Sequence, residues 1–448
     1  MWRHALALLV GGMFLLGGVD LVQAQSSKKK PAEEESAGAP RDYSSPNFVL
    51  HTDMSAEEAK ELLTRLETMI KLISAYFGQR LPHPIECYVA KDLKNWPPGS
   101  MPSEQGRAQI AAGAGVTITL SNGRVAKSTV YSVADGGTPQ HEAVHAYCGQ
   151  SFGSTGPVWY AEGMAEMGQY WKQGDPSVNC HPVVVEYLRK SAPKSMNEIV
   201  NSDERTGDSW ENYSWRWALC HLLANNKNYS DRFLPLGQAM MLKKPGASFN
   251  QTYGAMASEI SFEYLFFLKH FDIGYRADLC AWDWKKKFIK FKGASPLSST
   301  IEAMRGWQPT GAILTEGEEY EYSASGTWKT TKGKDAPSIT AGGNDEGAGR
   351  LIGVVIKEFD LEGSLDLDDY ISPPIELGEH GDFTAPSDGK LYLRCQESWT
   401  ELADNSGKLS VKLKVKGKGN PLPPPKTAVD KKNKPRSSSK KKTDEATE

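Results

Sequence analysis

The stretch His141-Glu142-Ala143-Val144-His145 decides how the N-terminal part of this chain is interpreted. On a helix, residues four positions apart lie on the same face, so both imidazoles can reach one metal ion. The glutamate lies one position round the helix from the first histidine, where it can reach a water molecule beside that metal. The pattern therefore predicts a zinc site with Glu142 as the general base of a hydrolytic reaction.

The residues before this motif predict where its helix begins. Gly136-Gly137 ends the preceding strand-like run, and Thr138 is a suitable N-cap. Pro139 fits the first helical position, where its missing N–H has no helical partner. We therefore expect Thr138 to cap a helix that carries both histidines.

A second helix is predicted after Gly156-Pro157, where residues 158–167 read Val-Trp-Tyr-Ala-Glu-Gly-Met-Ala-Glu-Met. A catalytic zinc site uses three protein ligands and leaves a fourth position for water. An antiparallel return of the chain would bring Glu162 to the metal as the third ligand. Glu166 lies one turn further along the same face and is the competing candidate. A solvated helix edge is the structural alternative, although apolar residues surround both carboxylates.

Short strands and a helix are predicted ahead of the motif. Residues 47–52 and 85–90 are apolar runs typical of strands. Between them, Ser55 and Glu58 form a capping box that opens an amphipathic helix. Together these patterns indicate an α+β fold for this part of the chain.

A hairpin is predicted immediately before the motif, because residues 116–120 and 129–133 flank Asn122-Gly123. The strand near residues 111–120 is a candidate for holding an extended peptide by β-addition. An ordinary sheet strand is the equally simple interpretation of the same residues.

In the order of these parts, residues 43–305 resemble the gluzincin metallopeptidases, specifically the bacterial peptidase-MA-like families of exported proteins. The resemblance implies a small sheet with a helical bundle, a zinc cofactor and a peptide or protein substrate. It implies that His141, His145 and Glu162 bind zinc and that Glu142 is catalytic. Glu166 then resembles an outer carboxylate that orients a ligand histidine.

Members of such families often place a tyrosine or histidine downstream to stabilise the oxyanion. Tyr213 is the candidate here, because it opens an apolar helix and a phenol can donate a hydrogen bond to an oxyanion. His221 and His181 are the alternatives. Simple packing in a tryptophan-rich core remains the structural explanation for Tyr213 and His221.

Residues 308–416 change to short alternating runs separated by Gly-, Asp- and Ser-rich turns, which predicts an all-β sandwich. Three segments (322–328, 389–394 and 404–411) resemble the galactophilic bacterial lectins of the PA-I type. That resemblance implies a glycan ligand and a calcium ion at the matching oxygen ligands, which are Glu397, Glu401, Asp404 and Asn405. A metal-free structural module is the alternative.

The flanks carry localisation signals. Residues 1–24 read as a signal peptide with a cleavage site after Ala24, residues 25–42 as a disordered linker, and residues 417–448 as a disordered basic tail. No later segment is long and apolar enough to span a bilayer. We therefore expect an exported protein, periplasmic or secreted, without a transmembrane segment after signal cleavage.

Composition limits the remaining possibilities. The chain has 448 residues, of which 39% are hydrophobic and 24% charged, with a net charge of −3. This balance argues against a nucleic-acid partner, which needs a basic surface. The six cysteines are too sparse for a disulfide scaffold, and either disulfide bonds or buried thiols are consistent with them.

Two functions follow from these patterns. The first is an exported zinc-dependent peptidase with a carbohydrate-binding accessory domain. The second is a non-enzymatic glycan-binding or surface protein on a peptidase-like scaffold. The intact set of His141, Glu142, His145 and Glu162 favours the first, because a decayed site usually loses a ligand or the base.

Overall fold

The protein is a mixed α+β chain that divides into two compact units. The computed structural model describes residues 38–123, 125–201, 210–333, 335–359 and 364–425. Within these residues, unit 1 consists of 38–173, 210–220 and 234–248, and unit 2 of 174–201, 221–233 and 249–425. The signal peptide predicted at 1–24 and the tail beyond 425 lie outside the described residues.

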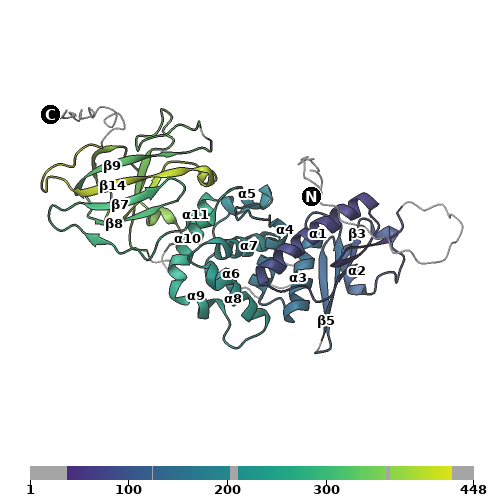
Figure 1. The fold of residues 1–448 in the computed structure, drawn as a ribbon. Coiled ribbons are helices and arrows are strands. Elements are labelled where there is room, and N and C mark those ends of the chain that lie inside the picture. Colours follow the sequence, from purple (N-terminus) through teal and green to yellow (C-terminus); the bar gives the residue numbers. More distant parts are fainter. Residues whose placement is uncertain (1–37, 124, 202–209, 334, 360–363, 426–448) are drawn as a thin grey trace, which may run out of the picture. The chain divides into compact units, whose positions relative to one another are not determined.

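Unit 1 is built on a five-stranded sheet in the order β1-β2-β3-β5-β4 (Figure 1). Strands β2, β3 and β5 are parallel, and β1 and β4 pair antiparallel at the two edges. The strands are β1 (Arg41–Ser44), β2 (Phe48–Thr52), β3 (Ile85–Ala90), β4 (Gly115–Ser121) and β5 (Ala126–Val133). The predicted hairpin is thus confirmed as β4 and β5. Strand β1 also corrects the linker prediction, because residues 41–42 pair with β2.

The helices of unit 1 cover both faces of this sheet. They are α1 (Ala56–Phe77), α2 (Glu104–Ala111), α3 (Thr138–Phe152) and α4 (Val158–Tyr170). Helix α2 lies on the face that carries Tyr131, close enough that a Cβ on Gly106 would lie 2.3 Å from the tyrosine ring. Helix α3 lies on the opposite face, where Ser128 of β5 donates to the carbonyl of Ala146.

Two predicted helix starts can be compared with the structure. The capping box of Ser55 and Glu58 is present at the start of α1, as predicted. At α3 the predicted cap is wrong by one residue. Gly137 is the N-cap, because its carbonyl already accepts the first helical hydrogen bond, from the N–H of His141 at 2.9 Å. Thr138 is therefore the first helical residue and makes no capping bond.

Unit 2 combines helices with a β-sandwich. Helices α7 (Trp210–Asn225) and α8 (Ser230–Met241) contribute residues to both units. The other helices of unit 2 are α5 (Pro182–Lys190), α6 (Met196–Val200), α9 (Phe249–Tyr253), α10 (Ala257–His270) and α11 (Ala277–Cys280).

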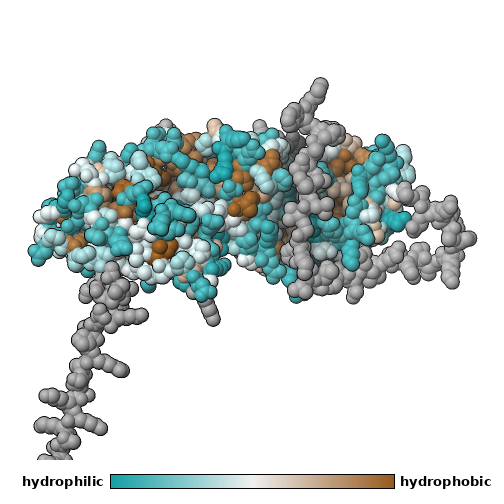
Figure 2. Space-filling view, turned by 90° about the horizontal axis from the view of Figure 1, so that it is seen from above, coloured by the Kyte–Doolittle hydropathy of each residue, from teal (hydrophilic) through white to brown (hydrophobic). Residues whose placement is uncertain are grey.

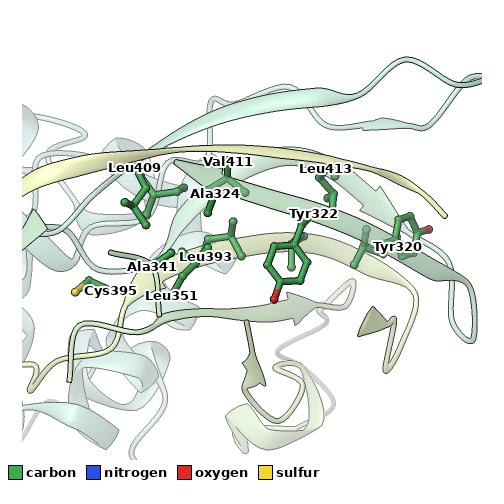
Figure 3. Packing of buried hydrophobic residues seen from close by; sticks show 14 of the residues in the cluster. Tyr320, Tyr322, Ala324, Ala341, Leu351, Leu393, Cys395, Leu409, Val411 and Leu413 are labelled. Carbon is green, nitrogen blue, oxygen red and sulfur yellow. The ribbon is translucent and has the colours of Figure 1, made fainter. Parts of the chain in front are cut away.

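The sandwich consists of a five-stranded sheet, β11-β10-β13-β8-β6, and a four-stranded sheet, β12-β9-β14-β7. Its core lies between the inner faces of these sheets, where Leu409, Val411 and Leu413 of β14 point towards Leu351 and Leu393 (Figure 3). The strands are β6 (Ile289–Lys290), β7 (Leu297–Glu302), β8 (Gln308–Leu314), β9 (Glu319–Lys329), β10 (Leu351–Ile356), β11 (Ile375–Glu376), β12 (His380–Thr384), β13 (Gly389–Cys395) and β14 (Ser406–Val415).

The sandwich begins earlier in the chain and ends later than the predicted range of 308–416. Strand β7 precedes that range and pairs with β14 along its length. At the other end, the buried ammonium of Lys414 donates to the carbonyls of Lys418 and Asn420, and Ser323 donates to the carbonyl of Pro423. Residues 417–425 are therefore packed on the sandwich rather than part of a disordered tail.

The outer face of the five-stranded sheet is also buried. Phe262 and Phe266 of α10 pack there with Trp282 against Ile352 and Tyr392. Because both of its faces are covered, β13 is buried along almost its whole length.

Glu263 of α10 is a buried carboxylate whose partners are all uncharged. It is 3% exposed and accepts hydrogen bonds from Tyr229 Oη and Trp284 Nε1, both at 2.7 Å. The side-chain amides of Asn226 and Asn228 also donate to it, as does the N–H of Trp282. Burial raises the pKa of Glu263, and these donors oppose that rise.

All six cysteines are free and buried (Cys87, Cys148, Cys180, Cys220, Cys280 and Cys395). The sequence was consistent with either disulfide bonds or buried thiols, and the structure contains buried thiols. Burial raises the pKa of Cys148 and Cys280 to about 12, so these thiols stay protonated at neutral pH.

None of the described helices is long and apolar enough to cross a membrane. On the face shown in Figure 2, hydrophilic residues predominate and hydrophobic residues form small separate patches.

The Glu263→Gln variant should destabilise the fold, because an amide would place N–H donors against the donors that now face a carboxylate. We expect a loss of about 2–3 kcal/mol in the free energy of unfolding. The measurement is urea unfolding followed by tryptophan fluorescence, to which Trp282 and Trp284 contribute directly. Glu259→Gln, on the same helix but without a hydrogen bond to another described residue, is the control and should change stability by less than about 0.5 kcal/mol. Equal stability of the two variants would contradict this account.

Candidate metal centre

Helix α3 presents His141 and His145 from a position fixed by the sheet beneath it. Gly149 lets the helix approach β4, since a Cβ there would lie 2.6 Å from Thr119 Oγ1. The two histidine rings stand edge to face with centroids 4.9 Å apart. Their Nε2 atoms lie 3.2 Å from each other.

Helix α4 brings the two glutamates to these histidines, as the spacing predicted. Gly168 allows the close approach to α3, because a Cβ there would lie 2.3 Å from Val144 Cγ2. On the other side of α4, Gly163 packs against α7, where a Cβ would lie 2.4 Å from Cys220 Sγ. Helix α4 is thus held between its neighbours through glycines.

Glu162, rather than Glu166, faces both Nε2 atoms. Its Oε2 lies 3.1 Å from Nε2 of His141 and 3.4 Å from Nε2 of His145. Among the described residues, these three side chains are the cluster whose ligand atoms lie close enough together to share a metal ion. The sequence left the choice between Glu162 and Glu166 open. The distances place Glu162 where it could be the third ligand.

Glu166 contacts the other side of the same imidazole. Its Oε1 lies 2.9 Å from Nδ1 of His141 and is placed to accept the Nδ1 proton. With Nδ1 donating to Glu166, Nε2 is the nitrogen that can bind a metal once its proton is lost. Burial by itself would lower the pKa of His141, but the hydrogen bonds with Glu162 and Glu166 outweigh it and hold the pKa well above its usual value.

Glu162 is held in its ionised form. Burial alone would raise its pKa, but the charge of His145 and hydrogen bonds with both histidines hold the pKa well below its usual range. The site therefore presents one carboxylate and two imidazole nitrogens towards a common point.

This donor set fits a zinc ion. Bonds of about 2.0–2.1 Å to nitrogen and oxygen in a tetrahedron imply ligand atoms about 3.3 Å apart. The three donor atoms here are separated by 3.1, 3.2 and 3.4 Å. Three such groups within hydrogen-bonding distance need a shared cation or extra protons, and a divalent metal supplies that charge.

Glu142 is positioned by the edge strand β4. The hydroxyl of Thr117 lies 2.8 Å from Glu142 Oε2 and 2.7 Å from the Glu142 carbonyl oxygen. Gly115 leaves room for the side chain, because a Cβ there would lie 2.7 Å from Glu142 Cγ. Glu142 is 7% exposed. The charge of its carboxylate contributes to the raised pKa of His141.

Tyr213 lies beside the metal-binding group. Its ring centroid is 5.5 Å from that of His141, at an interplanar angle of 35°. The guanidinium carbon of Arg216 lies 5.9 Å from the centroid of the tyrosine ring. The alternatives belong to unit 2, where His221 stacks on Phe267 and His181 caps α5.

The predicted calcium ligands do not form a comparable group. Among the described residues, Glu397, Glu401 and Asp404 are not part of any cluster of three such side chains close enough to share a metal. Asn405 is buried and donates from Nδ2 to the carbonyl of Ala303. Calcium and glycan binding at this loop remain predictions.

Several residues of the site were not foreseen from the sequence. The strand near 111–120 was recognised, but nothing in its pattern distinguishes Thr117 or Gly115 from ordinary strand residues. Gly163 and Gly168 carried a signal, because glycines within a helix often mark close packing. Arg216 had no signal of its own.

Comparisons with known proteins do not identify the chain. No family model and no curated protein matches it. It is similar to the solved EclA N-terminal domain, a PllA-like lectin, with 19% identity over 27% of this chain and 96% of that one and a TM-score of 0.21. It is also similar to Aeromonas hydrophila PliG, a periplasmic inhibitor of g-type lysozyme. The identity is 8% over 29% of this chain and 96% of PliG, and the TM-score is 0.16. At these values neither similarity indicates a function, and the gluzincin resemblance remains a prediction.

Metal binding distinguishes the roles of the two glutamates of α4. Titration with zinc against a competing chelator should give about one ion per chain, and Glu162→Ala should lose most of this binding because a ligand is removed. Glu166→Ala keeps the ligand atoms and should weaken affinity by about 10–100-fold. Full binding by Glu162→Ala together with loss in Glu166→Ala would reverse the assignment.

Proposed function

We propose that this chain is a zinc-dependent peptidase whose general base is Glu142. The observation that carries the proposal is a His-His-Glu donor set, formed by α3 and α4, beside a separately held carboxylate on α3. Glu142 is hydrogen-bonded to Thr117 rather than to the donor set, which leaves it available for proton transfer.

The residues present fit zinc, and His141, His145 and Glu162 would hold it. When bound, zinc acts as a Lewis acid towards a carbonyl oxygen and makes water a better nucleophile at neutral pH. Glu142 would take the proton from the attacking water and deliver it to the leaving amine. Glu166 would keep His141 in the tautomer that offers Nε2 as a ligand.

Strand β4 is the candidate surface for the peptide substrate. It is the edge strand of its sheet, and Thr117 links it directly to Glu142. An extended peptide could add to the free edge through main-chain hydrogen bonds. Such pairing would bring a peptide bond alongside the base, which supports a peptide rather than a small ester as substrate.

Tyr213 is the proposed donor to the developing oxyanion. Its ring lies against His141, one of the three residues of the donor set. Helix α7 is held there by its packing on Gly163 of α4.

Glu142→Gln should retain zinc and the fold but lose about 10²-fold or more in kcat, because a general base is removed. The assay is cleavage of a broad peptide library by the zinc-loaded protein, with metal content measured on the same sample. Glu186→Gln, at an exposed position of helix α5 in unit 2, is the matched control and should leave the rate unchanged. Undiminished turnover by Glu142→Gln would exclude this base. No hydrolysis by the parent protein would favour the non-enzymatic alternative.

Tyr213→Phe should lower kcat by about 10²–10³-fold with a small change in KM, the range seen when one oxyanion donor is removed. Zinc content and urea midpoint should stay at parent values, because the ring that contacts His141 is retained. A variant with parent kcat would assign Tyr213 to packing alone.

A further inference from the structure

A cavity of about 560 Å³ lies wholly within unit 2. Helix α10 forms one wall and strands β10 and β13 form another. The residues that the argument uses most are Trp307, Trp399, Arg394, Gln396 and Glu397.

Arg394 is a buried cation in the wall of this cavity. It is 3% exposed, and its Nε donates to the carbonyl of Cys395 at 2.8 Å while Nη2 donates to the carbonyl of Glu397. Among the described residues, no carboxylate forms an ion pair with it, and Nη1 has no hydrogen-bond acceptor. Burial lowers the pKa of Arg394 to about 10, so it remains charged at neutral pH.

A buried charge without a counter-charge is costly, and proteins normally pair it or hydrogen-bond it fully. Elsewhere in the same unit the rule is followed, since the buried Lys414 pairs with Glu321 at 2.5 Å. The other cation of the cavity wall, Lys269, pairs with Asp368. Arg394 is thus left with a donor edge that an anion in the cavity could accept.

Apolar residues of the wall, among them Trp307, Ile352 and Ile371, offer a ring a surface beside Arg394. The other aromatic contacts hold Arg394 in place. The guanidinium carbon of Arg394 lies 3.5 Å from the ring centroid of Trp399 and 5.5 Å from that of Trp307. Phe266 and His270 pack edge-on and tilted against Trp399. Burial lowers the pKa of His270 to about 4, so this imidazole is neutral and does not compete as a second cation.

Two oxygen acceptors in the wall, on Gln396 and Glu397, could accept hydrogen bonds from ligand hydroxyls. Oε1 of Gln396 is buried and has no hydrogen-bond partner among the described residues. The Glu397 carboxylate accepts one hydrogen bond, from the N–H of Ser398 to Oε1. The nearby carboxylates of Glu397 and Asp368 disfavour a doubly charged phosphate or sulfate more strongly than a singly charged carboxylate.

We propose that this cavity binds a hydroxylated ring carboxylate of the uronic-acid type, with its carboxylate on Arg394 and its hydroxyls on Gln396 and Glu397. The site needs no metal ion. It is independent of the proposed hydrolytic activity, because no residue of the His-His-Glu group contributes to it.

The test is isothermal titration of the full-length protein with glucuronate, in the presence of EDTA. We expect saturable binding of one glucuronate per chain. Glucose, which has the same ring without the carboxylate, should bind at least about tenfold more weakly, as expected for loss of a charge-assisted hydrogen bond. Benzoate and inorganic phosphate should also bind more weakly, because one lacks the hydroxyls and the other the ring.

Two variants locate the binding. Arg394→Lys keeps the charge but loses the planar fork, and affinity should fall by about tenfold or more. Gln396→Met removes a side-chain amide that makes no hydrogen bond with another described residue, so the fold should keep its urea midpoint while affinity falls about three- to tenfold. Arg350→Lys is the control, because Arg350 lies in the same sandwich outside the cavity and pairs with Glu376.

Absence of glucuronate binding would overturn the proposal, as would equal binding of glucose, benzoate or phosphate. Binding that EDTA abolishes would assign the ligand to a metal site instead. Should Arg394→Lys fail to fold, an unchanged affinity in Gln396→Met would still refute the arrangement. Glu162→Ala should bind glucuronate like the parent, so failure of the hydrolase proposal and failure of this one are separate results.

Discussion

Close packing of α4 between α3 and α7 is the constraint on which the candidate site depends. A Cβ at Gly168 would lie 2.3 Å from Val144, and one at Gly163 would lie 2.7 Å from the carbonyl oxygen of Arg216. A larger side chain at either position would push the helices apart. The distances of 3.1–3.4 Å between the three donor atoms could not then be kept. Backbone proximity, more than any single hydrogen bond, sets the geometry of the metal centre.

The buried charged groups of unit 2 have three different kinds of partner. Glu263 is surrounded by uncharged donors, and Lys414 has a carboxylate partner and two carbonyls. Arg394 instead lies over aromatic faces and uses only part of its donor capacity within the chain. The cation–π contact offsets part of the cost of burying this charge, by about 2 kcal/mol. This difference separates a structural charge from a candidate binding group.

Much of the metal centre could be predicted from the sequence because its ligands follow helical spacing. His141 and His145 are four residues apart, so any helix places them together. The choice between Glu162 and Glu166 could not be made the same way, since both lie on one face of α4 and only the distance to α3 separates them. Thr117 was missed because its role arises from the pairing of β4 with β5 and the packing of α3 on that sheet.

The sandwich was predictable where strands alternate strongly, as in β14, and less so at its ends. Strand β7 reads Leu-Ser-Ser-Thr-Ile-Glu, which is too short and polar to stand out beside helical segments. The alternating run around Arg394 is typical of a strand with one exposed face. Its burial depends on Trp399, just after β13, and on α10, which is distant in sequence. No local pattern reports the contact with α10.

In an oxidising compartment, the six buried thiols would affect how long the protein survives. While the chain is folded, each sulfur is shielded from oxidants and from the other thiols. Once it unfolds, oxidation to sulfenic acid or to non-native disulfides would compete with refolding. Survival would then be set by how often the chain opens rather than by how stable it is on average. For an exported protein, the activation barrier to unfolding would be the property under selection.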